Sequence, residues 1–372
     1  MKLTLQVQVL PTAEERRLLL DTMKAFNAAA SYAARVGFAD NVHSQPPLHH
    51  RCYYKIREQY GLSAQMTVRA IAKAVEVFRR DKTRCPIFKP YGAITYDERI
   101  LSWKGLDRVS IWTLEGRKIL PIVYGEYQSV RLNRLKGQVD LVYRNKRFYL
   151  FATVDMPEGV PIEPTEFLGV DLGIVNLATT SDGVQCCGKM VERARQRHHS
   201  TRRSLGKKMG VEHKRHTRRN AKCAIKRIGN REQRFRRHVN HCISRMLVDI
   251  AKDSERGIAI EDLGGIRDRT RFRREQRAKV SGWAFAQLRG FVEYKAALAG
   301  VPVVLVDPRN TSRTCSRCGH CEKANRPDQA TFRCQACGYT ANADVNAAIN
   351  IARGAAVNQP EVPEPHQILS AA

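Results

Sequence analysis

Three acidic side chains lie in apolar stretches where an unpaired charge is costly. Asp171 lies within the run GVDLGIVNLATT, where Phe167, Gly169 and Asp171 share one face of an expected strand. Glu261 closes the apolar run GIAIE, and Asp344 falls in the first turn of a later expected helix. Burial of an ionised acid costs several kcal/mol unless a partner or a metal compensates. Together the three acids predict a cation site, although each alone could be an ordinary surface or turn residue.

These acids are separated by about 80 to 90 residues, so they can meet only through the tertiary fold. An RNase H-like α/β sheet brings together two acids on strands and one on a helix. Carboxylate oxygens are the hard ligands that Mg²⁺ prefers, and two such ions activate water and steady the leaving oxygen of a phosphodiester. We therefore expect two Mg²⁺ ions, for which Mn²⁺ can substitute, bound by Asp171, Glu261 and Asp344. The same three residues are the predicted catalytic residues.

A second chemical signal is a pair of CxxCG sequences, CSRCG and CQACG, with 15 residues between their cysteine pairs. Four thiolates can surround one Zn²⁺ as a tetrahedron, and the glycine after each pair permits a tight turn. Cys321 adds an overlapping CxxC without a following glycine, so spacing alone leaves the register open, and four free thiols are the alternative. A closed set has no open coordination position, so we expect a structural Zn²⁺ bound by Cys315, Cys318, Cys334 and Cys337.

The overall charge of the chain points to a polyanionic partner. Its 372 residues contain 64 Lys plus Arg against 36 Asp plus Glu, a formal charge of +28. Such an excess exceeds what solubility needs, and a basic surface of the kind found on ribosomal proteins also indicates nucleic acid. We find no run of about 18 apolar residues and no secretory signal, so we expect a cytoplasmic protein with no membrane partner and with reduced cysteines.

The elements that position these residues begin with a strand. Residues 1–10 alternate between polar and apolar side chains. Thr12 and Glu15 have the spacing of a capping box, which predicts a helix after them. We expect a loop around Pro46 and Pro47 and then two further helices, over 53–60 and 63–80. The last helix has an outward basic face that either contacts nucleic acid or is merely solvated: Arg69, Lys73, Arg79 and Arg80.

Residues 86–156 consist of short apolar runs separated by glycine and charged residues. Strands at this spacing indicate an antiparallel barrel or sandwich, with residues 1–10 as a further strand and the helices as an insertion. Residues 144–146 have the composition of a hairpin turn. The three prolines of residues 157–164 predict a linker.

The rest of the chain alternates apolar elements with very basic segments. Between residues 193 and 237 there are 18 Lys plus Arg and two acids, which predicts a phosphate-binding region rather than a core. Residues 266–279 form a basic segment that we expect to be a mobile loop near the site. We expect a helix over 282–299, a buried parallel strand over 301–307 and a disordered tail after 354.

Three stretches resemble the TnpB (OrfB) proteins of bacterial insertion sequences, which are relatives of the type V CRISPR effectors: FLGVDLGIVNLATTSDG, IAIEDLGG and NTSRTCSRCG…FRCQACGYTANADVNAAINIARG. The resemblance covers residues 167–354, with a weaker likeness from 101–121 back to the N-terminus. It implies an α/β fold, with a RuvC (RNase H-like) nuclease core that contains an inserted four-cysteine zinc ribbon. It also implies an N-terminal β-barrel (wedge) domain with a helical recognition insertion.

The resemblance also implies domain boundaries and catalytic residues. The family's catalytic acids fall on Asp171, Glu261 and Asp344. The first barrel strand is expected over 1–10, the helical domain over 11–84 and the rest of the barrel over 85–165. The nuclease core is expected over 166–308, the zinc ribbon over 309–338, the last core helix over 339–354 and the tail over 355–372.

The function implied by the resemblance is RNA-guided cleavage of DNA next to a short flanking motif, by a protein encoded by a mobile element. The implied partners are a guide RNA and double-stranded target DNA, with one protein chain per RNA, in the bacterial cytoplasm and on the nucleoid when bound to DNA. Three alternatives remain: a guide-dependent repressor that binds DNA without cutting, a transposase, and a resolvase that needs no RNA.

Overall fold

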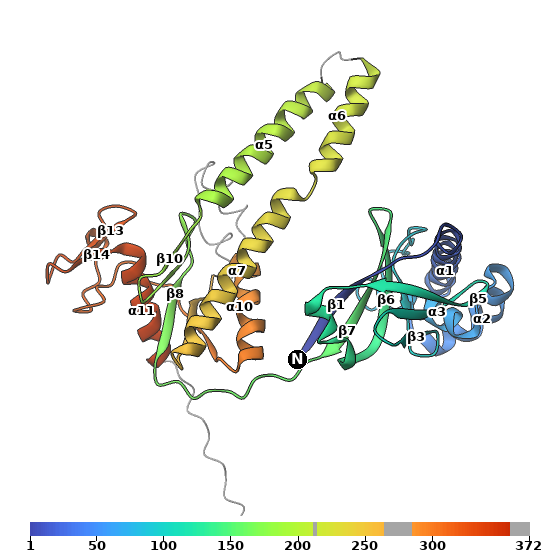
Figure 1. Cartoon of the computed structure of the whole chain (residues 1–372), viewed down its shortest axis with the longest axis horizontal. Helices are drawn as coiled ribbons and strands as arrows, with labels where there is room; N and C mark the ends of the chain where they lie inside the picture. The colour runs from blue at the N-terminus through green and yellow to red at the C-terminus, as the bar shows by residue number, and fades with distance from the viewer. Residues whose placement is uncertain (211–213, 264–284, 358–372) are drawn as a thin grey trace, which may run out of the picture. The chain divides into compact units, whose positions relative to one another are not determined.

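The computed structural model describes residues 1–210, 214–263 and 285–357 (Figure 1). The chain divides into two compact units, Met1–Pro157 and Glu158–Ala372. The basic segment over 266–279 lies outside the described residues, as does most of the expected tail.

The first unit is built on a seven-stranded antiparallel sheet in the order β2-β6-β7-β1-β5-β4-β3. The N-terminal strand is part of this sheet, as the sequence predicts, and it pairs with β7 along its whole length and with β5 on the other side. The strands are β1 Lys2–Val9, β2 Ile94–Tyr96, β3 Leu101–Lys104, β4 Arg108–Thr113, β5 Gly116–Val123, β6 Leu135–Arg144 and β7 Arg147–Asp155.

The sheet curls into a nearly closed barrel. The Tyr96 hydroxyl, on the strand at one end, donates to the carbonyl of Trp112 at 3.0 Å, close to the other end of the strand order. Alternate residues of β7 are fully buried inside: Phe148, Leu150, Ala152 and Val154. The hairpin turn is confirmed, since Asn145 and Lys146 connect β6 to β7 with φ angles of 51° and 61°.

Three helices are inserted between β1 and β2: α1 Ala13–Ala39, α2 Gln45–Tyr60 and α3 Ala64–Phe78. The capping box is confirmed, because the Glu15 amide donates to the Thr12 hydroxyl and the Thr12 amide donates to the Glu15 carboxylate. The barrel also contains the short helices α4 Glu126–Ser129 and η1 Leu132–Arg134.

Two expectations for these helices are wrong. Pro46 and Pro47 lie in the first turn of α2, where a missing N–H is tolerated because those amides have no helical partner. Lys73 does not extend into solvent: its ammonium donates to the Asn27 side chain at 2.6 Å and to the Ala93 carbonyl at 2.5 Å. The position of Lys73 on the polar side of α3 did not reveal that a neighbouring segment covers it.

The second unit contains a mixed five-stranded sheet in the order β10-β9-β8-β11-β12. Strand β9 is antiparallel to both of its neighbours, β10 and β8, whereas β8, β11 and β12 are parallel. This is the α/β core that the sequence predicts. The strands are β8 Phe167–Asp171, β9 Asn176–Thr180, β10 Gln185–Cys187, β11 Gly257–Glu261 and β12 Val303–Val306.

Helices cover both faces of this sheet. On one face, α7 (Arg231–Asp253) and α10 (Phe285–Ala299) bury Leu168 and Val170 of β8. On the other face, α11 (Ala343–Val357) packs its Ile351 with Phe167. The expected alternation of β8 is therefore confirmed, and Asp171 belongs to the face that α11 covers.

A glycine sets how closely α11 approaches the sheet. Any Cβ at position 169 would collide with the backbone carbonyl of Ala348 and the backbone amide of Ala352. Only glycine fits at this crossing of helix and strand. Gly169 therefore lets α11 lie directly against the strand that carries Asp171.

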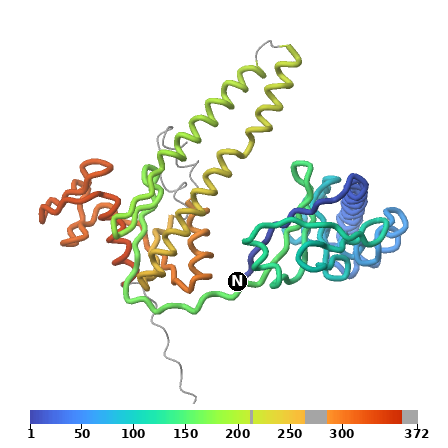
Figure 2. The backbone as a smooth tube through the Cα atoms, viewed as in Figure 1, coloured from blue at the N-terminus to red at the C-terminus, as the bar shows by residue number. Residues whose placement is uncertain are grey.

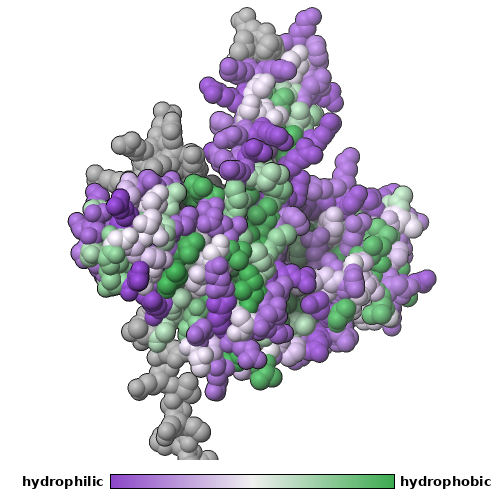
Figure 3. All heavy atoms as spheres, turned by 60° about the vertical axis from the view of Figure 1, so that its left-hand side comes forward, coloured by the Kyte–Doolittle hydropathy of each residue, from purple (hydrophilic) through white to green (hydrophobic). Residues whose placement is uncertain are grey.

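The most basic part of the chain forms a helical hairpin, α5 Lys189–Gly210 and α6 Arg215–Ile228, which extends from the sheet of the second unit (Figure 2). Each helix has one buried residue among those described, Val191 and Ala221. Hydrophilic side chains cover most of the hairpin in Figure 3. This surface fits the expectation of a phosphate-binding region that contributes little to the core.

The expected linker over 157–164 contains the boundary between the two units and has no helix or strand, and its Gly159 amide donates to the Ala297 carbonyl of α10 at 3.0 Å. Two expectations for the second unit need correction. The strand expected over 301–307 is not fully buried, because β12 lies at the edge of the described sheet and leaves Leu305 37% exposed. The last helix continues beyond 354 to Val357, with Ala355 buried.

Candidate metal centres

The two strand acids lie at the same edge of the sheet. Strands β8 and β11 are parallel neighbours that pair Val170 with Ile260, so Asp171 and Glu261 are the next residues on adjacent strands. The carboxyl ends of parallel strands meet at one edge, and residues at the same level of the pleat share a face. Asp171 and Glu261 therefore lie side by side on the face that α11 covers.

The third acid is brought to this edge by the start of α11. The Asn342 side chain accepts hydrogen bonds from the amides of Asp344 at 3.0 Å and Val345 at 3.2 Å, which caps the helix. The Asn176 side chain of β9 donates to the Asp344 carboxylate at 3.1 Å. The first turn of α11 is thus fixed against the sheet, with Asp344 facing the strand acids.

The electrostatics of the site show that the acids repel one another. Burial, which is the largest cause, and the charges of Glu261 and Asp344 together raise the pKa of Asp171 to about 7. Burial also raises the pKa of Glu261, against the opposing effects of a 2.5 Å hydrogen bond from the Thr311 hydroxyl and of Arg326. The structure thus brings together all three acids that the sequence singled out.

Within the part of the chain that the structure describes, one cation lies among these acids, and the sequence analysis missed it. The Arg326 guanidinium lies 3.3 Å from the Asp344 carboxylate, and the side chains are only 26% and 19% exposed. Its charge also lowers the pKa of Asp171 and of Glu261. The local sequence KANRPDQ has no periodicity that marks Arg326, and only its place in the fold shows its role.

The composition of the site fits divalent metal ions. Among the described residues, three carboxylates face a single guanidinium, so full ionisation leaves an excess of two negative charges over these four groups in a largely buried place. Hard oxygen donors with excess negative charge are the ligands that Mg²⁺ and Mn²⁺ prefer. The residues that would hold such ions are Asp171, Glu261 and Asp344.

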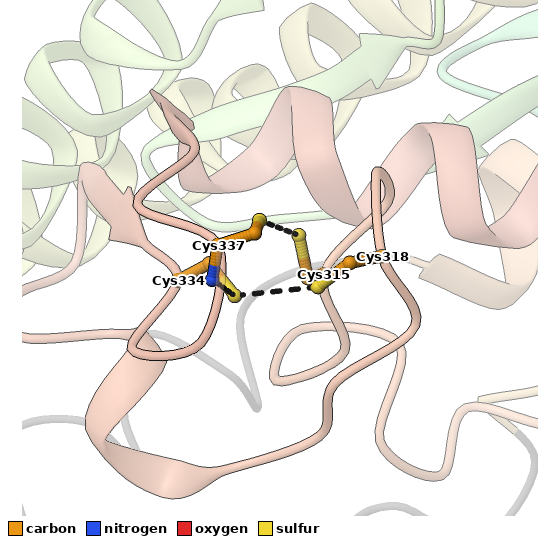
Figure 4. A group of neighbouring side chains, drawn as sticks. All are labelled: Cys315, Cys318, Cys334 and Cys337. Atoms are coloured by element: carbon orange, nitrogen blue, oxygen red, sulfur yellow. Dashed lines mark hydrogen bonds between the residues drawn. The ribbon is translucent and has the colours of Figure 1, made fainter.

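The four predicted cysteines form a much tighter cluster. The sulfur atoms of Cys315, Cys318, Cys334 and Cys337 all lie within 4.8 Å of one another and point toward a common centre (Figure 4). Among the described residues this is the one group of three or more potential His, Cys, Asp or Glu ligands that lie so close together. The cluster could hold a tetrahedral metal ion such as Zn²⁺.

The backbone around the cysteines has the geometry expected of two knuckles. Gly319 and Gly338 have φ angles of 77° and 69°, and the Cys337 amide donates to the Cys334 sulfur at 3.4 Å. The hydrogen bond from that amide is the largest cause that lowers the pKa of Cys334 to about 6. The lower pKa favours the thiolate form, which is the form that binds metal. Cys321 lies outside the cluster and pairs with Thr314 in an isolated bridge, which decides the register.

Buried and partly buried amide side chains connect the cysteine cluster to the acid site. Asn325, in the short helix η2 (Lys323–Asn325), donates to the carbonyls of Arg313 and His320 and accepts from the Gln335 amide, so it joins the two knuckles directly beside Arg326. Asn346 and Asn350 of α11 both donate to the Thr314 carbonyl. The ribbon, which also contains strands β13 Thr331–Arg333 and β14 Thr340–Asn342, is therefore fixed to the helix that carries Asp344.

Comparisons with known proteins identify the family. Residues 153–264 match the OrfB_IS605 family, described as "Probable transposase", and residues 285–351 match the Cas12f1-like TNB domain. InsQ of Escherichia coli strain K12, provisionally named an RNA-guided DNA endonuclease, is 30% identical over 310 residues, which cover 77% of this chain and 72% of InsQ. The chain belongs to the TnpB (OrfB) family. The resemblance drawn from the sequence is confirmed.

Several other relatives are CRISPR-associated proteins. The endodeoxyribonuclease Cas12f1 of Sulfoacidibacillus thermotolerans is 34% identical over 242 residues, 62% of this TnpB-family chain and 54% of Cas12f1. The chain thus spans about half the length of this curated relative, and less of two others.

Solved structures share the fold of this chain. A Cas12f1–sgRNA–target DNA complex aligns with a TM-score of 0.61 over 92% of this chain and 83% of that protein, at 14% identity. The mini-RNA-guided endonuclease Cas_phi3 aligns with a TM-score of 0.59 over 97% and 93%, at 11% identity. At these identities the likeness establishes the fold alone. Within the described residues, no helix is long and apolar enough to span a membrane.

Proposed function

We propose that this protein is an RNA-guided DNA endonuclease of a mobile element, which cuts DNA next to a short flanking motif. The observation that carries the proposal is the meeting of Asp171, Glu261 and Asp344 around Arg326 at one edge of the core sheet. InsQ and the Cas12f1 relatives have names that describe nucleases, which supports the same activity here.

The proposed cofactor is a pair of Mg²⁺ ions, for which Mn²⁺ can substitute, held by the three acids. When bound, such a pair supplies an activated water and stabilises charge on the leaving oxygen of a phosphodiester. The geometry supports this proposal because each ligand acid is buried or partly buried and, among the described residues, the three carboxylates outnumber the one guanidinium beside them.

The protein's own residues orient and balance this site. The Thr311 hydroxyl holds Glu261, and the Asn176 amide holds Asp344, so two of the three carboxylates have fixed rotamers. We propose that the Arg326 guanidinium neutralises part of the acids' charge and contacts the scissile phosphate, because guanidinium geometry suits phosphate oxygens. The four cysteines would hold a structural Zn²⁺ that fixes Asn325, and hence Arg326, beside the acids.

The proposed partners are a guide RNA and double-stranded target DNA, with one protein chain per RNA, in the bacterial cytoplasm. The formal charge of +28 and the cationic α5–α6 hairpin provide a surface for phosphate backbones. Base pairing with the guide would supply sequence specificity. We propose that the helical insertion and the barrel of the first unit read the flanking motif.

The test uses the full chain purified with its co-purifying RNA, which is sequenced to define the guide. The complex is incubated with Mg²⁺ and a DNA library that carries the matching target beside randomised flanking bases. We expect cleavage at one flanking motif, and no cleavage by Asp171→Ala despite unchanged RNA and DNA binding. Tight binding without product would instead identify a repressor, joined strands a transposase, and cleavage that survives removal of RNA a resolvase.

A further inference from the structure

A buried hydroxyl without a partner lies next to the acid site. Thr179 is 1% exposed, and its Oγ1 has no hydrogen-bond partner. Within the described residues it is the one fully buried hydroxyl left unsatisfied in this way. Such a group loses its hydrogen bonds to water on folding, which destabilises the folded protein. A hydroxyl of this kind therefore calls for an acceptor that becomes available in another state of the protein.

The strand register places Thr179 directly beside Asp171. The antiparallel pair β8–β9 aligns Thr179 with Asp171 and Thr180 with Val170. Residues aligned across an antiparallel pair point to the same face, with Cβ atoms about 4.5–5.5 Å apart. The Thr179 side chain therefore shares the α11 side of the sheet with the Asp171 carboxylate.

A β-bulge explains why β9 presents two polar residues to this side. Strand β10 pairs Cys186 with Ala178 and Cys187 with Asn176, which leaves Leu177 as the extra residue. Leu177 and Ala178 both pack into the core on the opposite face. Asn176 consequently points to the α11 side, where it binds Asp344, and Thr179 points there as well.

The other two acids already have side-chain donors of this kind. Thr311 donates to Glu261 at 2.5 Å and Asn176 donates to Asp344 at 3.1 Å. For the Asp171 carboxylate, in contrast, the hydrogen-bond donor among the described residues is the backbone amide of Leu172. One acid thus lacks the donor that its two neighbours have, and one donor beside it lacks an acceptor.

We propose that Thr179 is a positioning residue whose hydroxyl donates a hydrogen bond to the Asp171 carboxylate when that carboxylate binds a divalent ion. A carboxylate has several lone pairs, so one oxygen can face the ion while the other accepts from Thr179. The proposal rests on the nuclease function proposed above, because it assigns Thr179 to the same acids.

The experiment compares Thr179→Val, Thr179→Ser and wild type as full chains with their zinc retained. The probe is Mn²⁺ alone, with free Mn²⁺ counted by electron paramagnetic resonance. Valine keeps the shape of threonine and removes the hydroxyl. We expect Mn²⁺ affinity to fall by about ten- to a hundred-fold in Thr179→Val, the usual effect of losing a donor to a ligand, and to recover in Thr179→Ser.

The matched control is Thr180→Val, one residue along and also 1% exposed. The Thr180 hydroxyl faces the opposite side of the sheet and accepts from the Val184 amide at 3.1 Å. Its loss should lower the melting temperature without changing Mn²⁺ affinity. Thr179→Val should do the reverse: in buffer without divalent ions its melting temperature should equal or exceed that of wild type, because an unsatisfied hydroxyl is gone.

The outcomes separate this inference from the proposed function. If wild type binds Mn²⁺ and cuts DNA while Thr179→Val binds Mn²⁺ equally well, the role of Thr179 is refuted and the nuclease stands. Equal loss of affinity in Thr179→Val and Thr180→Val also refutes it, because the effect would then be general disruption of β9. A wild-type chain whose Mn²⁺ binding is unchanged by Asp171→Ala refutes the acid site itself.

Discussion

The cysteine cluster and the acid cluster of the second unit are assembled in opposite ways. The four cysteines come from 23 consecutive residues, 315–337, and their sulfur atoms already lie within 4.8 Å of one another. The three acids come from β8, β11 and α11, spread over 174 residues, 171–344, and their charges oppose one another. The first cluster can form from local turns, whereas the second exists only after the whole sheet has formed.

This difference indicates that the two proposed metal sites of one unit have opposite effects on its stability. The ribbon has a small apolar core of its own that includes Phe332 and Ala343, so metal binding should supply much of its folding free energy. The sheet and its helices hold the three acids close together, and the repulsion between their like charges lowers the stability of the fold. Removing a ligand should therefore destabilise the ribbon but relieve strain at the acids.

The largest expected effect is on activity, in Asp171→Asn. Cleavage should fall to background because an amide does not supply the charge that the ions need. Thermal stability without divalent ions should rise by about 0.5–2 kcal/mol, since the change removes a buried acid with a raised pKa from beside Glu261 and Asp344. Calorimetry and a cleavage assay measure the two effects. Asp249→Asn, exposed on α7, is the control and should change neither. Lower stability of Asp171→Asn would contradict the contrast.

The next largest effect is on stability, in Cys334→Ser. Zinc content should fall from one ion per chain toward none, and the second unit should lose at least about 3 kcal/mol of the ~10–16 kcal/mol that structural zinc supplies in zinc-finger peptides. Metal analysis and thermal unfolding measure these changes. Cys321→Ser is the matched control, since Cys321 is an exposed cysteine of the same ribbon outside the cluster. Full zinc content in Cys334→Ser would require a different ligand set.

A smaller effect is expected where the two clusters meet, in Arg326→Met. Cleavage should fall by about 10²-fold, the usual loss when one donor to a developing negative charge is removed. The pKa of Asp171 should also rise, because Arg326 is the cation that lowers it. Single-turnover cleavage at several pH values measures both. Arg333→Met, an exposed arginine on β13, should behave as wild type. Faster cleavage by Arg326→Met would mean that the guanidinium competes with the ions.

The smallest expected effect is on the pH dependence of stability, and it concerns the partly buried ammonium of Lys73. Burial lowers the pKa of Lys73 to about 8, from 10.5 when exposed. Since the folded value is the lower one, the stabilising contribution of this group is present above pH 10.5 and is lost as pH falls through 8. Relative to Lys73→Met, wild-type stability should therefore increase between pH 8 and 10. Urea unfolding followed by tryptophan fluorescence measures it, with exposed Lys55→Met as control. Parallel pH profiles of wild type and Lys73→Met would contradict the assignment.

Most of what the sequence predicts correctly depends on local patterns. Alternation along residues 1–10, the Thr12 capping box and the spacing of the cysteines each record a constraint within a few residues. The acids were recognisable because Asp171 and Glu261 interrupt strands that are otherwise apolar. Their assignment as catalytic residues remains a prediction until the variants are tested.

What the sequence does not reveal depends on contacts between distant segments. Arg326 has no local signature, and its meeting with Asp344 exists only because Asn325, Asn346 and Asn350 fix the ribbon to α11. Lys73 lies on the polar side of its helix, yet the loop at Ala93 covers it. The exposure of Leu305 could not be foreseen either, because an apolar run does not show which strand forms the edge of a sheet.

The missing side chain at position 169 has a consequence for how this site can evolve. Since α11 rests on bare backbone there, a single methyl group would act as a shim that lifts Asp344 away from the two strand acids while every ligand stays intact. The spacing of the three proposed ligand acids thus depends on the absence of a side chain at Gly169, and we expect a substitution there to abolish the proposed cleavage as completely as the loss of an acid.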